Sequence, residues 1–289
     1  MTLLRTKKIR KRLLITAILV VNTALIYYWL FVNLNANLSV SFLNIGQGDA
    51  ILIQTPGEQN ILIDSGDGVK IIEELSTKLD WFDRQIDLFI LTHPHNDHIG
   101  GAIEVIKRYK VKEIMYTNVS YDSPLYLALL SIIKEKNIKT LVIDAPININ
   151  FGNNCALSII YPFEDISAKE FENINNSSVV SRLDCENKKF LLAGDVELEI
   201  EEILVEAEMD LKADVYKASH HGSDTSNGQA FLDLVQPEIT IIQVGADNTF
   251  GHPSLRTLNR LERIGSKVYR NDLDGTIELY INNGELLYR

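Results

Sequence analysis

The sequence of 289 residues predicts a four-layer αββα sandwich of mixed α+β and α/β character, preceded by one N-terminal transmembrane helix. Three observations predict this fold class. An apolar run occupies residues 13–32, short apolar strands separated by Gly and Pro follow it, and strands then alternate with helices in both halves of the chain. Two halves that each bury a sheet beneath helices can pack sheet against sheet, which gives four layers.

The N-terminal segment has the properties of a membrane anchor. Residues 1–12 carry six basic side chains and no acidic one, and residues 13–32 would span about 30 Å as a helix, the hydrocarbon thickness of a bilayer. Aromatic residues close the run, which suits a membrane interface; a cleaved signal peptide and a buried core helix are the alternatives. The positive-inside rule keeps the basic tail in the cytoplasm. We therefore expect a single-pass protein of the cell membrane with an extracytoplasmic catalytic domain.

Local patterns define the elements of the first half. Apolar runs of four or five residues, bounded by turn-forming residues, predict strands at 38–42, 50–54, 60–63, 88–92, 111–115 and 140–143. Apolar residues spaced three or four positions apart predict helices at 69–79, 100–109 and 123–137.

The second half repeats the mixture. Strands are predicted at 155–161, 178–184, 189–193, 214–218, 239–244, 267–270 and 275–281. Helices are predicted at 196–208, 228–235 and 254–264. The boundary between the halves falls near residues 144–150, but the two sheets would share one core. Residues 38–289 therefore count as one domain.

The charge distribution restricts the partners. The net charge is −11, and the chain after residue 32 has 22 basic and 39 acidic side chains, a formal charge of −17. Such an acidic body is poorly suited to non-specific capture of nucleic acid, although bound metal ions can reverse the field locally.

Two cysteines, Cys155 and Cys185, stand apart from any Cys-x-x-Cys pair, which excludes a zinc ribbon. They are either two small buried residues or a disulfide. The disulfide requires an exported domain whose two flanking strands pair antiparallel.

The strongest functional signal is the placement of the six histidines, each at a predicted junction between a strand and a loop. The apolar strand 88–92 ends, and four potential metal ligands follow at once: His93, His95, Asp97 and His98. Imidazole and carboxylate groups suit zinc, manganese or iron. The spacing puts the first two ligands on one side and turns the last two toward a second position. The sequence therefore predicts two adjacent divalent ions.

Two later strand ends complete this site. Asp195 follows the apolar residues 190–193 and is predicted to bridge the two ions; the alternative is a helix N-cap. His220 and His221 follow another strand, and one of the two should complete the second ion. The sequence does not decide between them.

Together these motifs resemble the metallo-β-lactamase superfamily: His-x-His-x-Asp-His, Gly-Asp after an apolar strand, and His-His-Gly-Ser. Residues 44–50, 62–66, 192–195 and 251–253 further resemble the extracytoplasmic hydrolase domain of ComEC-type competence proteins. The likeness covers about residues 38–281.

The resemblance implies a dinuclear site with the ligands His93, His95, Asp97, His98, Asp195 and either His220 or His221. The first two histidines would hold one ion, the next two residues the other, and Asp195 would bridge.

The resemblance also implies supporting roles. Asp64 would orient the His-rich loop from behind the ligands. His252 would contact a phosphate or act as general acid, which makes it, with Asp97, a candidate catalytic residue. Asn176 and Ser178 lie where many superfamily members supply a further histidine. Fewer nitrogen ligands shift the expected preference from zinc toward manganese.

Two adjacent ions could hold a bridging hydroxide for in-line attack on a phosphodiester. The resemblance thus implies a phosphodiesterase or nuclease whose partners are the membrane and an anionic phosphodiester, with DNA as one candidate. Nothing in the sequence points to an obligate protein partner. The alternatives are a hydrolase of small or cell-wall phosphate esters, resembling phosphocholine esterases, a lactone hydrolase, and a binding module without catalysis.

Overall fold

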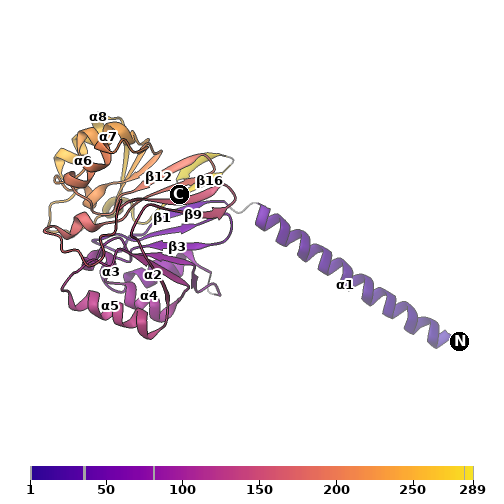
Figure 1. Ribbon diagram of the computed structural model, residues 1–289. Helices are drawn as coiled ribbons and strands as arrows, with labels where there is room; N and C mark the ends of the chain where they lie inside the picture. The colour runs from indigo at the N-terminus through magenta and orange to yellow at the C-terminus, as the bar shows by residue number, and fades with distance from the viewer. Residues whose placement is uncertain (1, 35–36, 81, 283, 289) are drawn as a thin grey trace. The chain divides into compact units, whose positions relative to one another are not determined.

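The computed structural model describes residues 2–34, 37–80, 82–282 and 284–288, with side chains from residue 11 to 27 and from residue 37 onward. The chain divides into two units, Met1–Asn37 and Leu38–Arg289. The first unit is one helix, α1 (Thr2–Leu34) (Figure 1). Among the described residues, no helix combines the length and apolar character that a membrane span requires. Part of the predicted tail and anchor, the side chains of residues 1–10 and 28–32, lies outside the described residues.

Within the second unit, the first sheet has eight strands in the order β17-β16-β1-β2-β3-β5-β7-β8. Strands β3, β5, β7 and β8 run parallel, and the others pair antiparallel. The bounds are β1 (Ser39–Phe42), β2 (Ile51–Gln54), β3 (Asn60–Ile63), β5 (Leu88–Ile90), β7 (Glu113–Tyr116), β8 (Lys139–Val142), β16 (Ile277–Asn282) and β17 (Glu285–Tyr288). Two short strands, β4 (Gln85–Ile86) and β6 (Lys110–Val111), form a separate pair.

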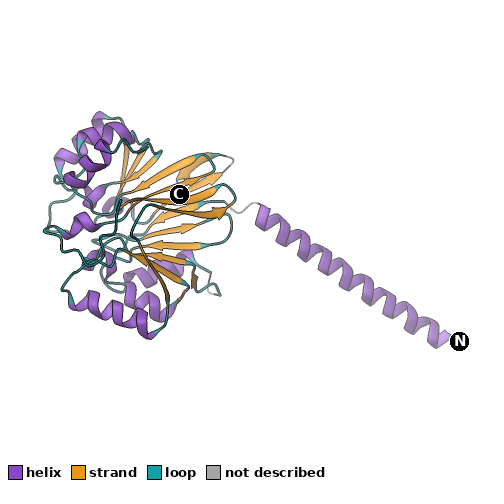
Figure 2. Ribbon diagram, viewed as in Figure 1, coloured by secondary structure: helices purple, strands orange, loops and turns teal. Residues whose placement is uncertain are grey.

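The second sheet has seven strands in the order β15-β14-β13-β12-β11-β10-β9. In the second unit the strands lie together between two groups of helices (Figure 2). Its strands from β12 to β15 are parallel. The bounds are β9 (Ile147–Gly152), β10 (Cys155–Tyr161), β11 (Val180–Cys185), β12 (Lys188–Leu192), β13 (Val215–Lys217), β14 (Ile239–Ile242) and β15 (Lys267–Arg270).

Helices cover the outer face of each sheet (Figure 1). The first sheet packs against α2 (Lys70–Lys78), α4 (Ala102–Arg108) and α5 (Pro124–Glu135), and the second against α6 (Leu198–Glu206), α7 (Gln229–Val235) and α8 (Leu255–Arg263). Short helices are α3 (Asn96–Ile99), α9 (Asn271–Asp274), η1 (Ile174–Ser177) and η2 (Ser219–Gly222).

The two faces of each sheet are both buried. On β2, Ile51 and Ile53 face the core between the sheets, while Leu52 faces the helices. A strand buried on both faces is continuously apolar rather than alternating, which explains the short apolar runs in the sequence. The predicted four-layer sandwich is confirmed.

The structure corrects the division of the chain into two halves. The last predicted strand, 275–281, is β16, and it pairs with β1 of the first sheet rather than with the second sheet. Long-range pairing of this kind leaves no local signal in the sequence. Strand β9 was not predicted, although Ile147, Ile149 and Phe151 alternate with polar residues and pack against the core between the sheets.

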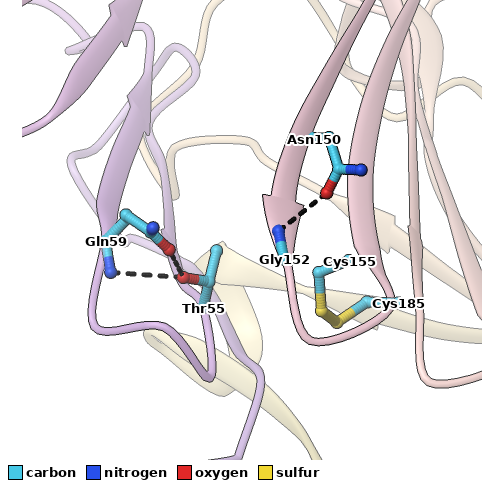
Figure 3. The surroundings of a disulfide bond; sticks show 6 residues. All are labelled: Thr55, Gln59, Asn150, Gly152, Cys155 and Cys185. Atoms are coloured by element: carbon cyan, nitrogen blue, oxygen red, sulfur yellow. Dashed lines mark hydrogen bonds between the residues drawn. A yellow bond between two sulfur atoms is a disulfide. The ribbon is translucent and has the colours of Figure 1, made fainter.

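Cys155 and Cys185 form a disulfide bond between β10 and β11 (Figure 3). The two residues lie directly opposite each other in an antiparallel pair, with their Cα atoms 4.1 Å apart, and both are buried. Antiparallel pairing was one of the two conditions for a disulfide, the other being an exported domain, and the structure contains the bond.

A buried acid organises the helix layer of the second sheet. Glu201 on α6 accepts hydrogen bonds from the backbone N–H groups of Asn227 and Gly228, each 2.7 Å long. Burial raises the pKa of the Glu201 carboxyl to about 7, against the effect of these hydrogen bonds and of Arg260. The acid thus fixes the turn before α7 at the cost of holding a proton near neutral pH.

We expect Glu201→Gln to remove a pH-dependent loss of stability. The pKa of Glu201 is about 7 in the folded chain and 4.5 in a model peptide. The stabilisation of the fold by the protonated Glu201 side chain is therefore full below pH 4.5 and is lost as pH rises through 7. Between pH 5 and pH 8 the wild type should lose on the order of 2–3 kcal/mol relative to the variant. Urea denaturation across this pH range measures the difference. Glu206→Gln, at an exposed position of the same helix, is the control, and a flat difference for Glu201→Gln would contradict the argument.

Candidate metal centre

Strand ends from both sheets meet at one place. Asp64 follows β3 and residues 93–98 follow β5, its parallel neighbour in the first sheet. Asp195 follows β12, and residues 220–221 follow the parallel strand β13 in the second sheet. Because parallel strands end at the same edge, each sheet delivers its polar residues to one side.

The backbone of the loop 93–98 lies close to the backbone of the turn between β1 and β2. The backbone N–H of Asp49 donates a hydrogen bond to the Asp97 carbonyl, 3.0 Å away. At Gly48, with φ of 117°, a Cβ atom would lie 2.0 Å from that same carbonyl oxygen. Only glycine fits there, which explains the glycine directly before Asp49.

Four side chains converge at the centre of the site: Asp97, His98, Asp195 and His221. Their ligand atoms all lie within 4.8 Å of one another. The Nε2 atoms of His98 and His221 are 3.1 Å and 3.2 Å from the same Asp195 oxygen. Both nitrogens are buried and make no hydrogen bond. Buried polar atoms without partners are rare in native proteins, and nitrogen and carboxylate groups so arranged fit a divalent metal ion.

A second pair of histidines adjoins this group. The His93 ring centroid lies 4.9 Å from that of His95 and 4.1 Å from that of His98. The Nε2 of His93 is also buried without a hydrogen bond. Burial lowers the pKa of His95, and lowers that of His93 well below its usual value. Both rings are therefore neutral, the form in which imidazole binds metal.

Asp64 lies behind His98. Its carboxylate accepts hydrogen bonds from the Nδ1 of His98 at 2.7 Å, and from the backbone N–H and hydroxyl of Thr92 at 2.8 and 2.6 Å. A carboxylate that receives three hydrogen bonds acts only as acceptor, so Nδ1 of His98 must carry the hydrogen and Nε2 is free to face the site.

The structure distinguishes the two adjacent histidines. His221 points its Nδ1 at the Gln243 carbonyl, 2.8 Å away, and its Nε2 at the central group. His220 lies outside that group, with its Nδ1 3.2 Å from Glu197 and its Nε2 3.3 Å from the Asn175 amide. His221 thus belongs to the group of side chains that fits a metal ion, and His220 lines the cavity outside that group.

Residues 175–178, Asn-Asn-Ser-Ser, brace the turn that carries Asp195. The Ser178 hydroxyl accepts a hydrogen bond from the Asp195 backbone N–H at 3.1 Å, and the Asn176 side chain accepts one from the Glu197 N–H at 3.0 Å. The neighbouring Asn175 has a buried Oδ1 without a hydrogen-bond partner.

Two further charged residues, Lys217 and Asp49, were assigned no role from the sequence. Lys217 on β13 is fully buried, donates to the Gly194 carbonyl at 3.0 Å, and forms ion pairs with Asp49 and Asp195. A lone lysine within an apolar strand is a usable signal, because lysine is almost never fully buried unless it is paired.

A cavity of about 420 Å³ opens over the site and is lined by His95, Asp97, Asp195, His220, His221 and His252, among others. Burial, with the neighbouring His220 and His221, lowers the pKa of His252 to about 4. Its ring is therefore neutral at physiological pH.

Comparison with known proteins agrees with this geometry. Residues 43–151 match the family model described as the metallo-beta-lactamase superfamily. The chain contains a metallo-beta-lactamase domain. This match and the Asp/His cluster that fits a divalent ion together support a metal-dependent hydrolase.

The domain also resembles competence proteins. The chain is 28% identical over 282 residues to ComE operon protein 3 of Bacillus subtilis, covering 90% of this chain and 35% of that protein. It is 26% identical over 250 residues to competence protein ComA of Neisseria gonorrhoeae, covering 85% of this chain and 33% of that protein. The chain thus spans about a third of the length of these relatives.

A solved structure shares the fold. The metallo-beta-lactamase fold protein YhfI from Bacillus subtilis superposes with a TM-score of 0.53 at 10% identity, covering 88% of this chain and 100% of that one. At this identity the likeness shows the fold alone.

We expect Asp64→Asn to weaken metal binding to this metallo-beta-lactamase domain by roughly 10- to 100-fold, because the neutral amide would hold the His98 ring less firmly. Equilibrium dialysis against zinc and manganese, with circular dichroism to verify folding, measures the change. Asp165→Asn, on an exposed loop, is the matched control. A folded Asp64→Asn variant with the metal affinity of the wild type would show that the residue does not orient His98.

Proposed function

We propose that this chain is a phosphodiesterase that uses two divalent ions, zinc or manganese, and is anchored in the cell membrane. One observation carries the proposal: two adjacent groups of buried and half-buried histidines and carboxylates lie beneath an open cavity. His93 and His95 would hold one ion, and Asp97, His98 and His221 the other. Asp195 would bridge them.

When bound, divalent ions in such a site supply an activated water and neutralise charge on an anionic substrate. The chain's own residues supply the rest. Asp97 and Asp195 hold negative charge at the floor of the cavity, because the nearby imidazoles of His98 and His221 keep the pKa of each below its usual value despite burial. Lys217 adds to this effect at Asp195. His252, neutral at physiological pH, can donate one hydrogen bond to a substrate oxygen. That favours the substrate-contact role for His252 over the general-acid role.

Two observations bear on the substrate. The names of the competence relatives support nucleic acid. Against a long polymer, no lysine or arginine lines the cavity among the residues that the structure describes, whereas polynucleotide binding depends on cationic side chains. A small phosphate ester is therefore the second candidate.

The membrane placement rests on the sequence and on the disulfide. Six basic residues precede the apolar run 13–32, which supports a cytoplasmic tail and an outward-facing domain. The Cys155–Cys185 disulfide supports the same orientation, because disulfides persist in oxidising compartments.

We expect His221→Ala and His220→Ala to differ sharply. His221→Ala should lose one of two bound metal equivalents and at least about 100-fold in kcat/KM, because it removes a ligand, whereas His220→Ala should keep both equivalents. Elemental analysis and hydrolysis of bis(p-nitrophenyl) phosphate by the reconstituted full chain provide the measurements. Single-stranded DNA and a lactone complete the substrate panel. A wild type that binds two ions and cleaves no phosphodiester would reject the proposed activity.

We expect the catalytic domain to be accessible from outside the cell. In spheroplasts of an expressing bacterium, external protease should digest it, while the chain itself should fractionate with membranes. Cys155 and Cys185 should react with a thiol reagent only after reduction and denaturation. A protected domain with thiols that react without reduction would contradict this orientation.

A further inference from the structure

An exposed aromatic side chain stands at the edge of the metal-site cavity. Phe250 lies in the loop between β14 and α8, is 67% exposed, and lines the cavity together with His252. The two rings are stacked, with centroids 5.9 Å apart and planes inclined by 16°. The ring centroid of His252 lies 5.5 Å from that of His220, which lies 6.1 Å from that of His221. A row of rings thus leads from the metal ligands outward to Phe250.

The loop that presents Phe250 is firmly held. The Asn248 side chain accepts a hydrogen bond from the His252 backbone N–H and donates to the His252 and Gly245 carbonyls, at 3.1, 3.0 and 2.9 Å. The Gly245 N–H donates in turn to the Gln47 side chain at 3.2 Å. The loop is therefore braced at both ends while most of the Phe250 ring stays in water. A single exposed apolar side chain is common at a protein surface. Phe250 differs in that it lines the cavity over the site in a braced loop, where an aromatic ring can contact a ligand.

The charges around the cavity restrict what this ring can bind. The described residues that line the cavity include Asp67, Asp97 and Asp195 but no lysine or arginine. A second cavity of about 680 Å³ begins beside His220, where Glu197 lies 3.2 Å from the His220 ring. Five acidic residues and one arginine line it: Glu170, Glu172, Glu197, Glu199, Asp224 and Arg256. Additional phosphates along a polymer would meet carboxylates there.

We infer that Phe250 is a stacking platform for a flat ring beside the scissile phosphate, so that the substrate class is a short, base-bearing phosphodiester rather than a long polynucleotide. The inference rests on the proposed phosphodiesterase function for the reaction, but the stacking contact itself needs no hydrolysis. A cavity of about 420 Å³ has the size of a small-ligand site. Stacking of a base on an aromatic side chain contributes about 1–3 kcal/mol and requires no cation.

The test is equilibrium binding to the zinc-loaded full chain, with a phosphorothioate thymidine dinucleotide and its abasic analogue as probes. We expect the wild type to bind the base-bearing probe roughly 5- to 150-fold more tightly than the abasic one. This ratio is the stacking free energy expressed as a ratio of dissociation constants. Phe250→Ala and Phe250→Leu should both abolish the preference, and Phe250→Trp should keep it. The leucine variant retains apolar area without a flat face, so it separates stacking from simple hydrophobic contact.

Leu255→Ala is the matched control, since Leu255 is 78% exposed near the same loop and does not line the cavity. It should leave the preference unchanged. Equal binding of the two probes by the wild type, or an unchanged preference in Phe250→Ala, would overturn the inference.

Probe length tests the second half of the inference. A 20-nucleotide thymidine strand should bind no more tightly per site than the dinucleotide, with little dependence on salt. Affinity that rises with length and falls steeply with salt would instead reveal a polyanion groove. If the base preference depends on Phe250 but no diester is cleaved, the proposed function fails and the stacking site stands. If diesters are cleaved and the Phe250 variants bind like the wild type, only the stacking site fails.

Discussion

The site depends on a buried balance of charge beneath it. Asp49 comes from the first sheet, Asp195 and Lys217 from the second, and the lysine ammonium pairs with both carboxylates where none of the three is exposed to solvent. Removing one partner from such a group leaves an uncompensated charge in a medium of low dielectric, which costs several kcal/mol. The pairing therefore joins the two sheets and fixes the carboxylate that would bridge the ions. Asp64 performs the same task for His98 from the other side.

This balance also makes the site receptive to cations. Burial disfavours the charged forms of His98 and His221, but Asp195, with Asp64 and Asp49, outweighs burial and raises the pKa of each imidazole well above its usual value. The same carboxylates that hold protons on these nitrogens would attract divalent ions to them, so protons and metal compete for one position. The Nε2 atoms of His98 and His221 lie near the Asp195 carboxylate without a hydrogen bond to it, because side chains from the two sheets aim at a common point rather than at one another.

Much of the fold could be predicted because its signals are local. Continuous apolar runs identified the strands, and four ligand-type residues directly after 88–92 identified the His-rich loop. The return of β16 to the first sheet could not be predicted, because pairing across more than two hundred residues leaves no local pattern. The choice between His220 and His221 was also out of reach. Both have left-handed backbone conformations, φ 48° and 52°, so the alternation of an extended chain does not tell which side chain faces inward. Lys217 was overlooked, although an isolated charge in an apolar strand implies a buried partner.

The same physical terms explain how an acidic domain could select a phosphate ester. With a formal charge of −17 after residue 32 and no cationic side chain among the described residues that line the cavity, the favourable potential for an anion would be confined to the bound ions themselves. The bound ions would then neutralise the charge of one phosphate, whereas each further phosphate would meet no cationic side chain among these lining residues. Binding energy for the rest of the substrate must come from uncharged contacts, and Phe250, held by Asn248 in a row of rings that begins at the ligands, is positioned to supply them. Charge would thus limit substrate length, while stacking would select the group that flanks the reacting phosphate.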